Sequence, residues 1–248
     1  MSKRKPAPTP PPPAPAQRLL IDGVTGLTYG PGTIAGTTAE AVRVIRSVGV
    51  TLNYLTLKDA GGAGILDYGD SGLSIIEPDI LRCGRAVIAD SAGKDTQGSG
   101  IIIQGSGTTI SGGSVIDCGN DTIFEHGIYV SRLAWQAQII GTTLIGNAAS
   151  GIKLAGGVDA SGLKVSGSPR GVVLASLPSG VTAILRGSVI AGSTYAVMAE
   201  IGASLTGYSL DWNTYAAGSR FRLPSGAVVD LAGWQRATGL DAHSTLTP

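Results

Sequence analysis

Tyr129 and Lys153 occupy the same position in two similar segments of the chain, Gly-Ile-Tyr-Val and Gly-Ile-Lys-Leu. If these segments stack as neighbouring strands, the two Cα atoms lie about 5 Å apart. A tyrosine or a histidine can take a proton from a substrate, and a nearby cation can neutralise a carboxylate. His126 adds a second base and Arg170 a second cation. The four residues are therefore the predicted catalytic set for removal of a proton beside a carboxylate.

Three further residues are predicted to bind substrate beside this set. Arg85 and Asp90 flank another segment of the same kind, and Trp135 offers an indole ring on which a sugar could stack. An inverting hydrolase is an alternative, and it needs two carboxyl groups that flank the scissile bond. The pairs available are Asp117 with Asp121, or Asp121 with Glu125, in a loop whose composition is typical of turns.

Cysteines and acidic residues offer little further chemistry. Cys83 and Cys118 follow equivalent segments of consecutive repeats, so stacking would bring them within disulfide range. A reduced, buried pair is favoured over a disulfide, and no base motif marks either thiol as a nucleophile. Asp67, Asp90 and Glu200 do not fall on adjacent repeats. No metal site and no cofactor is therefore predicted.

The elements that position these residues come from a repeat. Six short segments open with Gly or Ala and continue with a β-branched residue, which is Ile65, Val87, Ile128, Ile152, Val172 or Val197. The separations between these residues are 22, 41, 24, 20 and 25. Recurrence at this period is typical of a solenoid, in which each repeat buries its apolar face against its neighbours. The gap of 41 indicates a repeat with an insertion, or one poorly matched extra repeat.

A second set of segments alternates with the first and follows the pattern apolar–x–Gly–x–x–apolar. Over about residues 20–210 this combination resembles the right-handed parallel β-helix family of pectate lyases, alginate-modifying enzymes and phage tailspikes. The segments amount to about eight coils. The resemblance implies an all-β chain with a sugar-binding groove on the outer face of the first sheet, where Tyr129, Lys153, His126 and Arg170 would serve a lyase or epimerase that acts on a uronate polymer. Family members often stack Asn at the fourth position of the pattern. Here that position holds Gly32, Leu55, Asp79, Gly113, Thr143, Leu163, Ser188 and Tyr208, so no Asn ladder is predicted.

The C-terminal residues carry an independent resemblance. Leu-Asp-Trp-Asn-Thr-Tyr at 210–215, Trp-Gln at 234–235 and Thr-Gly-Leu-Asp-Ala-His-Ser at 238–244 resemble the closing segment of bacterial secreted β-helix proteins. This resemblance implies an irregular cap, which would cover the unpaired backbone of an open end. The predicted organisation is an arm at 1–18, a parallel β-helix at 19–210 and a capping segment at 211–248.

Charge is divided unevenly along the chain. The first 18 residues hold 4 of the 18 basic residues and none of the 17 acidic ones, which leaves 14 basic and 17 acidic residues in the remainder. Residues 19–248 therefore carry a net charge of −3 and show no stripe of basic residues, which argues against nucleic-acid binding. No apolar run reaches the roughly 18 residues of a membrane span. No secretory signal is visible before the proline-rich residues 6–16, and an extracellular or virion-surface location is expected.

Four predicted outward positions are apolar and suit a surface covered by a loop or by another subunit. These predicted partner contacts are Leu66, Ile88, Val173 and Met198, joined by Lys3, Arg4 and Lys5 of the arm. They favour a structural, receptor-facing rod, such as the tail spike, fibre or decoration protein of a phage, anchored by its arm to a virion or cell-surface protein. A homotrimer is one expected assembly of such a rod. A polysaccharide lyase or epimerase and a non-catalytic carbohydrate-binding module are the alternatives.

Overall fold

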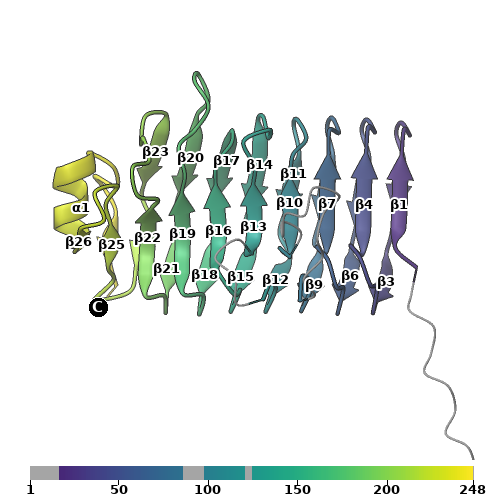
Figure 1. Cartoon of the computed structure of the whole chain (residues 1–248), viewed down its shortest axis with the longest axis horizontal. Helices are drawn as coiled ribbons and strands as arrows, with labels where there is room; N and C mark the ends of the chain where they lie inside the picture. Colours follow the sequence, from purple (N-terminus) through teal and green to yellow (C-terminus); the bar gives the residue numbers. More distant parts are fainter. Residues whose placement is uncertain (1–16, 86–97, 121–124, 248) are drawn as a thin grey trace, which may run out of the picture.

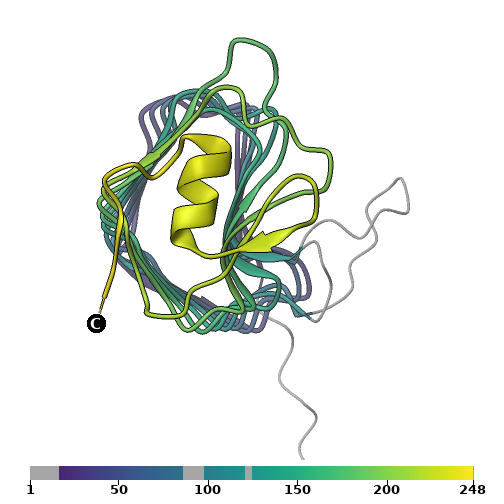
Figure 2. The same cartoon turned by 90° about the vertical axis from the view of Figure 1, so that its left-hand side faces the viewer.

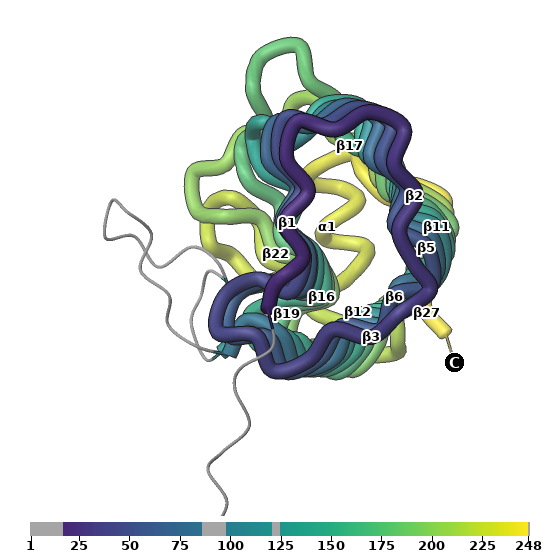
Figure 3. Tube along the Cα trace, turned by 90° about the vertical axis from the view of Figure 1, so that its right-hand side faces the viewer, coloured from purple at the N-terminus to yellow at the C-terminus, as the bar shows by residue number. Residues whose placement is uncertain are grey.

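Each coil of the chain adds one strand to each of three β-sheets, and the coils stack along one axis (Figures 1 and 3). The computed structural model describes residues 17–85, 98–120 and 125–247. Within these ranges all strand pairs are parallel except β25 with β26, which are antiparallel. The predicted parallel β-helix is confirmed.

The three sheets are named here by their order along a coil. Sheet 1 contains β1 (Leu19–Asp22), β4 (Val42–Ile45), β7 (Ile65–Tyr68), β10 (Ile101–Ile103), β13 (His126–Val130), β16 (Ser150–Leu154), β19 (Arg170–Leu174), β22 (Tyr195–Ala199), β25 (Phe221–Arg222) and β26 (Val228–Val229). Sheet 2 contains β2 (Thr28–Tyr29), β5 (Thr51–Asn53), β8 (Ser74–Ile76), β11 (Thr109–Ser111), β14 (Ala137–Ile140), β17 (Val158–Ser161), β20 (Ala183–Arg186) and β23 (Tyr208–Asp211). Sheet 3 contains β3 (Gly32–Ala35), β6 (Leu55–Lys58), β9 (Asp79–Leu81), β12 (Ser114–Ile116), β15 (Thr143–Ile145), β18 (Lys164–Ser166), β21 (Val189–Ala191), β24 (Thr214–Tyr215) and β27 (Thr245–Leu246).

The core is a set of apolar rows that run along the axis inside the coils. One row of sheet 1 consists of fully buried β-branched residues, namely Val42, Ile65, Ile101, Ile128, Ile152, Val172 and Val197. Burial of each such side chain stabilises the fold by about 1.5–3 kcal/mol relative to exposure. The pairing of Ile128 with Ile152 and of Tyr129 with Lys153 is as the repeat predicts.

The glycine that opens most strands of sheet 1 has a packing reason. A Cβ atom added at Gly151 would lie 2.3 Å from Cγ1 of Val165 in sheet 3 and 2.9 Å from the carbonyl oxygen of Gly171. A Cβ atom at Gly100 would likewise lie 2.2 Å from Cγ1 of Val115. At Gly100 and Gly151 only a hydrogen fits where the chain enters sheet 1 against the side chains of sheet 3.

Gly151→Ala is therefore expected to lower the free energy of unfolding by about 1–3 kcal/mol, because an overpacked core must shift. Gly32→Ala is the matched control, since its added Cβ would meet nothing closer than Cδ2 of Leu55 at 3.9 Å. That control should change stability by no more than about 0.5 kcal/mol. Urea denaturation followed by circular dichroism measures both variants, and equal stability would contradict this account of the repeat.

Sheets 2 and 3 meet at a sharp corner, so the second predicted set of segments is two strands rather than one. The corner residue has a left-handed backbone, with φ of +67° at Gly141 and +63° at Gly162. Glycine adopts this conformation without the steric cost of a Cβ atom. The glycine of the apolar–x–Gly–x–x–apolar pattern therefore marks the corner.

Four coils differ from the sequence assignment. The strand that pairs with both β7 and β13 is β10, while residues 86–89, to which the prediction gave that rung, lie outside the described residues. In the coil of β14 and β15 the inward residues are Ile139 and Leu144, while Ile140 and Ile145 point outward. In the coil of β8 and β9 it is Ile75, rather than Ile76, that is buried and pairs with Leu52, and in the last coil Leu210 pairs with Leu185. The fourth position is therefore held by Pro78, Thr142 and Asn213, in place of Asp79, Thr143 and Tyr208.

The corrected register places asparagine at two corners. Oδ1 of Asn213 accepts a hydrogen bond from the Ser188 amide at 3.0 Å, and its Nδ2 donates to the Leu185 carbonyl at 3.1 Å. At the corner between sheets 3 and 1, Asn147 bonds in the same way to the Cys118 amide and the Val115 carbonyl. The predicted absence of ladder asparagine is thus wrong at residue 213.

The C-terminal end of the stack carries a helix that the sequence reading missed. The helix α1 (Leu231–Thr238) lies across the last coil (Figure 2). Asp230 caps its first turn by accepting from the Gly233 amide at 2.8 Å, and Gly239 ends it with a left-handed φ of +71°. Trp234 is fully buried, with its ring 5.8 Å from that of Phe221. None of the helices in the described residues has the length and apolar character of a membrane span.

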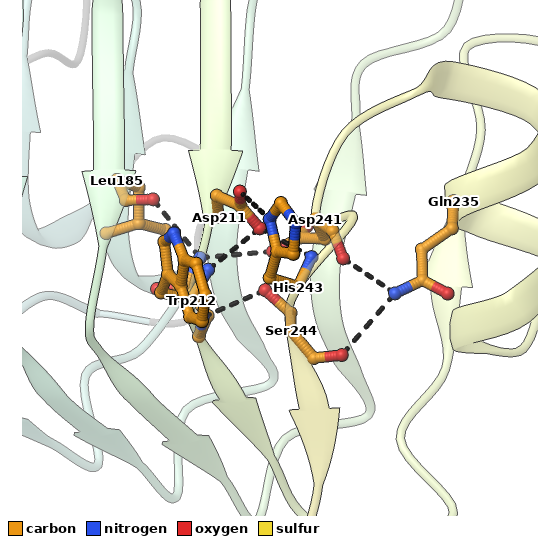
Figure 4. A network of polar contacts seen from close by, with 8 residues as sticks. Leu185, Asp211, Trp212, Gln235, Asp241, His243 and Ser244 are labelled. Atoms are coloured by element: carbon orange, nitrogen blue, oxygen red, sulfur yellow. Dashed lines mark hydrogen bonds and ion pairs between the residues drawn. The ribbon is translucent and has the colours of Figure 1, made fainter.

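Beyond residue 210 the chain forms short paired strands both before and after the helix α1. Sheet 3 continues through β24 and β27, while the polar side chains of the C-terminal motif bond to one another (Figure 4). Nδ1 of His243 lies 2.7 Å from Oδ2 of Asp211, and its ring stacks on that of Trp212 at 4.5 Å. The domain boundary at residue 210 stays a prediction.

Candidate functional site

The four predicted catalytic residues lie on neighbouring rungs of sheet 1. Tyr129 in β13 pairs with Lys153 in β16, and Nζ of Lys153 is 5.7 Å from the centre of the Tyr129 ring. The centre of the His126 ring is 5.8 Å from that of Tyr129. Arg170 begins the next strand, β19. The repeat therefore predicted this cluster correctly in space.

The Lys153 ammonium is already engaged. Its Nζ atom lies 2.6 Å from Oε1 of Glu200, and its side chain is only 14% exposed. Glu200 directly follows β22, two rungs further along the sheet. A substrate carboxylate would have to displace this acid in order to pair with Lys153.

His126 is closed off and weakly basic. It is 1% exposed, and its Nδ1 atom lies 2.7 Å from the hydroxyl of Ser150. Burial lowers the pKa of His126 to about 3, and the charges of Lys153 and Arg170 act in the same direction. At neutral pH the imidazole is neutral and has little affinity for a substrate proton.

The remaining members of the cluster are also poorly suited to proton abstraction. Burial raises the pKa of Tyr129, and the charge of Glu200 raises it further. A tyrosine base must be deprotonated, so this shift opposes its use. Burial and the charge of Arg222 lower the pKa of Arg170. The cluster has the residue types of a lyase site, but its environments favour the neutral forms of both bases.

The apolar outward positions of sheet 1 are covered by the chain itself. Leu66 is 3% exposed, Val173 1% and Met198 6%. Leu66 forms a small separate cluster with Ala63 and Ile102, and Tyr129 packs against it. Leu66, Val173 and Met198 are therefore buried within one chain, which agrees with a surface covered by a loop, and their contact with another subunit stays a prediction.

Arg85 lies apart from this cluster. Its guanidinium donates to the carbonyl of Asp117, with Nη2 at 3.1 Å, close to Cys118 and Asn120 at the corner between sheets 3 and 1. Five predicted site residues lie outside the described residues, namely Lys3, Arg4, Lys5, Ile88 and Asp90. Asp121 of the hydrolase alternative lies outside them as well.

Trp135 lies at a different site, on the outer side of sheet 2. Its side chain is 46% exposed beside a cleft of about 520 Å³. The polar residues that line the cleft are Thr109, Gln136, Gln138, Asp159 and Thr182. Sequence reasoning found only Trp135, although Thr109, Gln138 and Asp159 occupy equivalent outward positions of successive strands.

The two cysteines stack on consecutive coils as fully buried free thiols. Sγ of Cys83 lies 3.7 Å from the Leu57 carbonyl, and Sγ of Cys118 lies 3.9 Å from the Ile80 carbonyl. The structure therefore holds them as the reduced, buried pair that the sequence favours.

No family model matches the sequence, and no curated protein matches it. Among solved structures, a mutant tailspike protein of E. coli bacteriophage HK620 in complex with a pentasaccharide aligns over 90% of this chain and 41% of its own, at 11% identity and a TM-score of 0.50. The fold is that of a tailspike-like parallel β-helix.

Two further tailspike structures are similar at lower scores. A second mutant of the HK620 tailspike, also in complex with pentasaccharide, aligns over 79% of this chain and 39% of its own, at 12% identity and a TM-score of 0.40. The Dettilon tailspike protein aligns over 93% of this chain and 62% of its own, at 14% identity and a TM-score of 0.34. The tailspike-like β-helix described here thus spans about two fifths of the first of these proteins.

Proposed function

We propose that this chain is a structural, receptor-facing β-helix of a phage virion that contacts surface glycans without cleaving them. The observation that carries the proposal is the fold match, over 90% of the chain, to a tailspike protein in complex with a pentasaccharide. The exposed Trp135 beside an open cleft supports a glycan contact. The low pKa of His126 and the raised pKa of Tyr129 support binding without turnover.

Glycan binding is tested with an array of bacterial surface oligosaccharides and the full chain. We expect retention on a subset of the glycans, and no ultraviolet-absorbing unsaturated product after incubation with uronate polymers. A product that forms with the wild type and disappears in Lys153→Ala would overturn the proposal in favour of a lyase. Absence of binding to every glycan would overturn the glycan contact.

The basic arm is the proposed attachment to the virion. Residues 1–18 carry a charge of +4, which suits an acidic partner surface. Co-sedimentation with phage particles compares the full chain with a chain that starts at residue 19, and the shorter chain should be lost from the pellet. A homotrimer is part of this proposal, and its interface would use surfaces other than Leu66, Val173 and Met198, which are buried within one chain.

A further inference from the structure

The cleft beside Trp135 arises from a difference in the lengths of three successive connections. Six residues (131–136) join β13 to β14, three (155–157) join β16 to β17, and eight (175–182) join β19 to β20. The short connection therefore lies low between two longer ones, as Figure 1 shows for the turns before β14, β17 and β20. The longest of the three projects from the stack in Figures 2 and 3.

Two glycines let the short connection pack closely against the preceding turn. A Cβ atom at Gly156 would lie 2.0 Å from the Ser131 carbonyl oxygen, and one at Gly157 would lie 3.2 Å from the Gln136 amide nitrogen. The Gly157 amide also donates to the Ala134 carbonyl at 3.0 Å. The backbone of this connection thus packs directly against the preceding turn, and the space above it stays open.

The floor of the cleft is a row of side chains from four rungs. Strand pairing places Thr109, Gln138, Asp159 and Ile184 side by side on β11, β14, β17 and β20. At about 4.8 Å per rung, the row extends over about 14 Å. The turn that carries Trp135 forms one wall, and Gly180, Val181 and Thr182 of the long connection line the other. This is an elongated groove, a shape that suits a chain molecule.

The groove offers an aromatic face and uncharged hydrogen-bonding groups. Trp135 can stack its ring on the apolar face of a sugar while its edge stays in water. Within the described residues, the side-chain amides of Gln136 and Gln138 make no hydrogen bond to the protein, so both are available to a ligand. Hydroxyl and N-acetyl groups of sugars match such donors and acceptors.

The charged group that lines the groove favours a neutral sugar over an acidic one. Asp159 is the one charged residue among those that line the groove in the described structure, and its Oδ2 atom is paired with Nη2 of Arg186 at 2.7 Å. A uronate or sialate carboxylate would thus meet an acid and find no free cation. Building on the proposed function, we propose that this groove, lined by Trp135, Gln138 and Asp159, binds a neutral oligosaccharide of hexose or N-acetylhexosamine units.

The experiment measures binding of the wild type, Trp135→Ala, Gln138→Ala, Leu133→Ala and Lys153→Ala to a panel of neutral and uronate-containing bacterial oligosaccharides. Leu133 is the matched control, because it lies on the same turn, is 68% exposed and does not line the groove. We expect neutral glycans to bind, and Trp135→Ala and Gln138→Ala to weaken that binding at least tenfold. Leu133→Ala should bind as the wild type does, and Lys153→Ala tests the cluster on sheet 1 as the alternative binding site. Circular dichroism and thermal unfolding check that each variant is folded.

The possible failures are distinguishable. If glycans bind but only Lys153→Ala loses affinity, the assignment of the groove is wrong while the proposed function stands. If uronate-containing glycans alone bind, the assignment of a neutral ligand is wrong. If the folded wild type binds no glycan in the panel, the groove assignment and the proposed glycan contact fail together.

Discussion

Asp241→Ala is expected to destabilise the C-terminal end of the β-helix by about 3–5 kcal/mol, because it leaves several buried donors without an acceptor. Asp241 is fully buried, and its carboxyl group accepts four hydrogen bonds. The donors are Nδ2 of Asn213 at 3.1 Å, the hydroxyl of Tyr215 at 2.9 Å, the hydroxyl of Ser244 at 2.6 Å and Nε1 of Trp234 at 3.0 Å. One carboxyl group thereby ties α1 to β24 and to the last turn.

Asp230→Ala is the matched control for this prediction. It makes the same chemical change in the same cap but removes one helix-capping bond, to the Gly233 amide, at a cost of about 1 kcal/mol. Because each coil of a solenoid is stabilised by its neighbours, loss of the cap should loosen the last coils first. Hydrogen exchange should therefore speed up in β23 and β24 of Asp241→Ala before it changes in β16. Equal stability of the two variants would contradict the role assigned to the Asp241 network.

The fold was predictable because the repeat has a physical cause at each position. A β-branched residue fills the inward row of sheet 1, and the glycine before it avoids a clash with the side chains of sheet 3. Both features are visible in sequence, so the pairing of Ile128 with Ile152 followed directly. The error at 86–89 arose where Gly100 and Ile101 fit the same pattern at a longer spacing.

Register was harder to predict where two adjacent residues are both apolar. Ile139 and Ile140 cannot be assigned to inside and outside by hydropathy alone, and the structure buries only the first. The helix α1 was missed although Asp230 and Gly239 are typical start and stop residues, because the segment was read as irregular.

The candidate sites were predictable only in part. Stacking brought Tyr129 and Lys153 together, but the burial of His126 and of the outward apolar row depends on tertiary packing that the repeat pattern does not encode. The groove beside Trp135 depends on relative loop lengths, and those become visible only once the strand boundaries are known.

Asp67 is the clearest departure from the apolar pattern of the core. It holds an inward position of sheet 1 between Val44 and Ile103, and it is fully buried. Burial, with a smaller contribution from the adjacent Asp70 carboxyl, raises the pKa of Asp67 to about 7, against a hydrogen bond from Thr108 that lowers it. The folded protein therefore binds a proton that the unfolded chain, with an ordinary pKa of 3.8, releases at lower pH. Stability from this group is complete below about pH 4 and is lost as the pH rises through 7.

Asp67→Asn is expected to remove most of this pH dependence, because an amide keeps an acceptor for Thr108 and the Gly105 amide and carries no titratable proton. Between pH 5 and pH 8 the wild type should lose about 2–3 kcal/mol of unfolding free energy through Asp67. The variant should keep only a smaller slope from Asp70, whose pKa burial also raises. Asp59→Asn is the control, since the hydrogen bond from Arg82 lowers the pKa of Asp59 and places its titration below this window. Urea denaturation at both pH values measures the slopes, and a slope for Asp67→Asn equal to that of the wild type would mean that the buried acid is not protonated at pH 5.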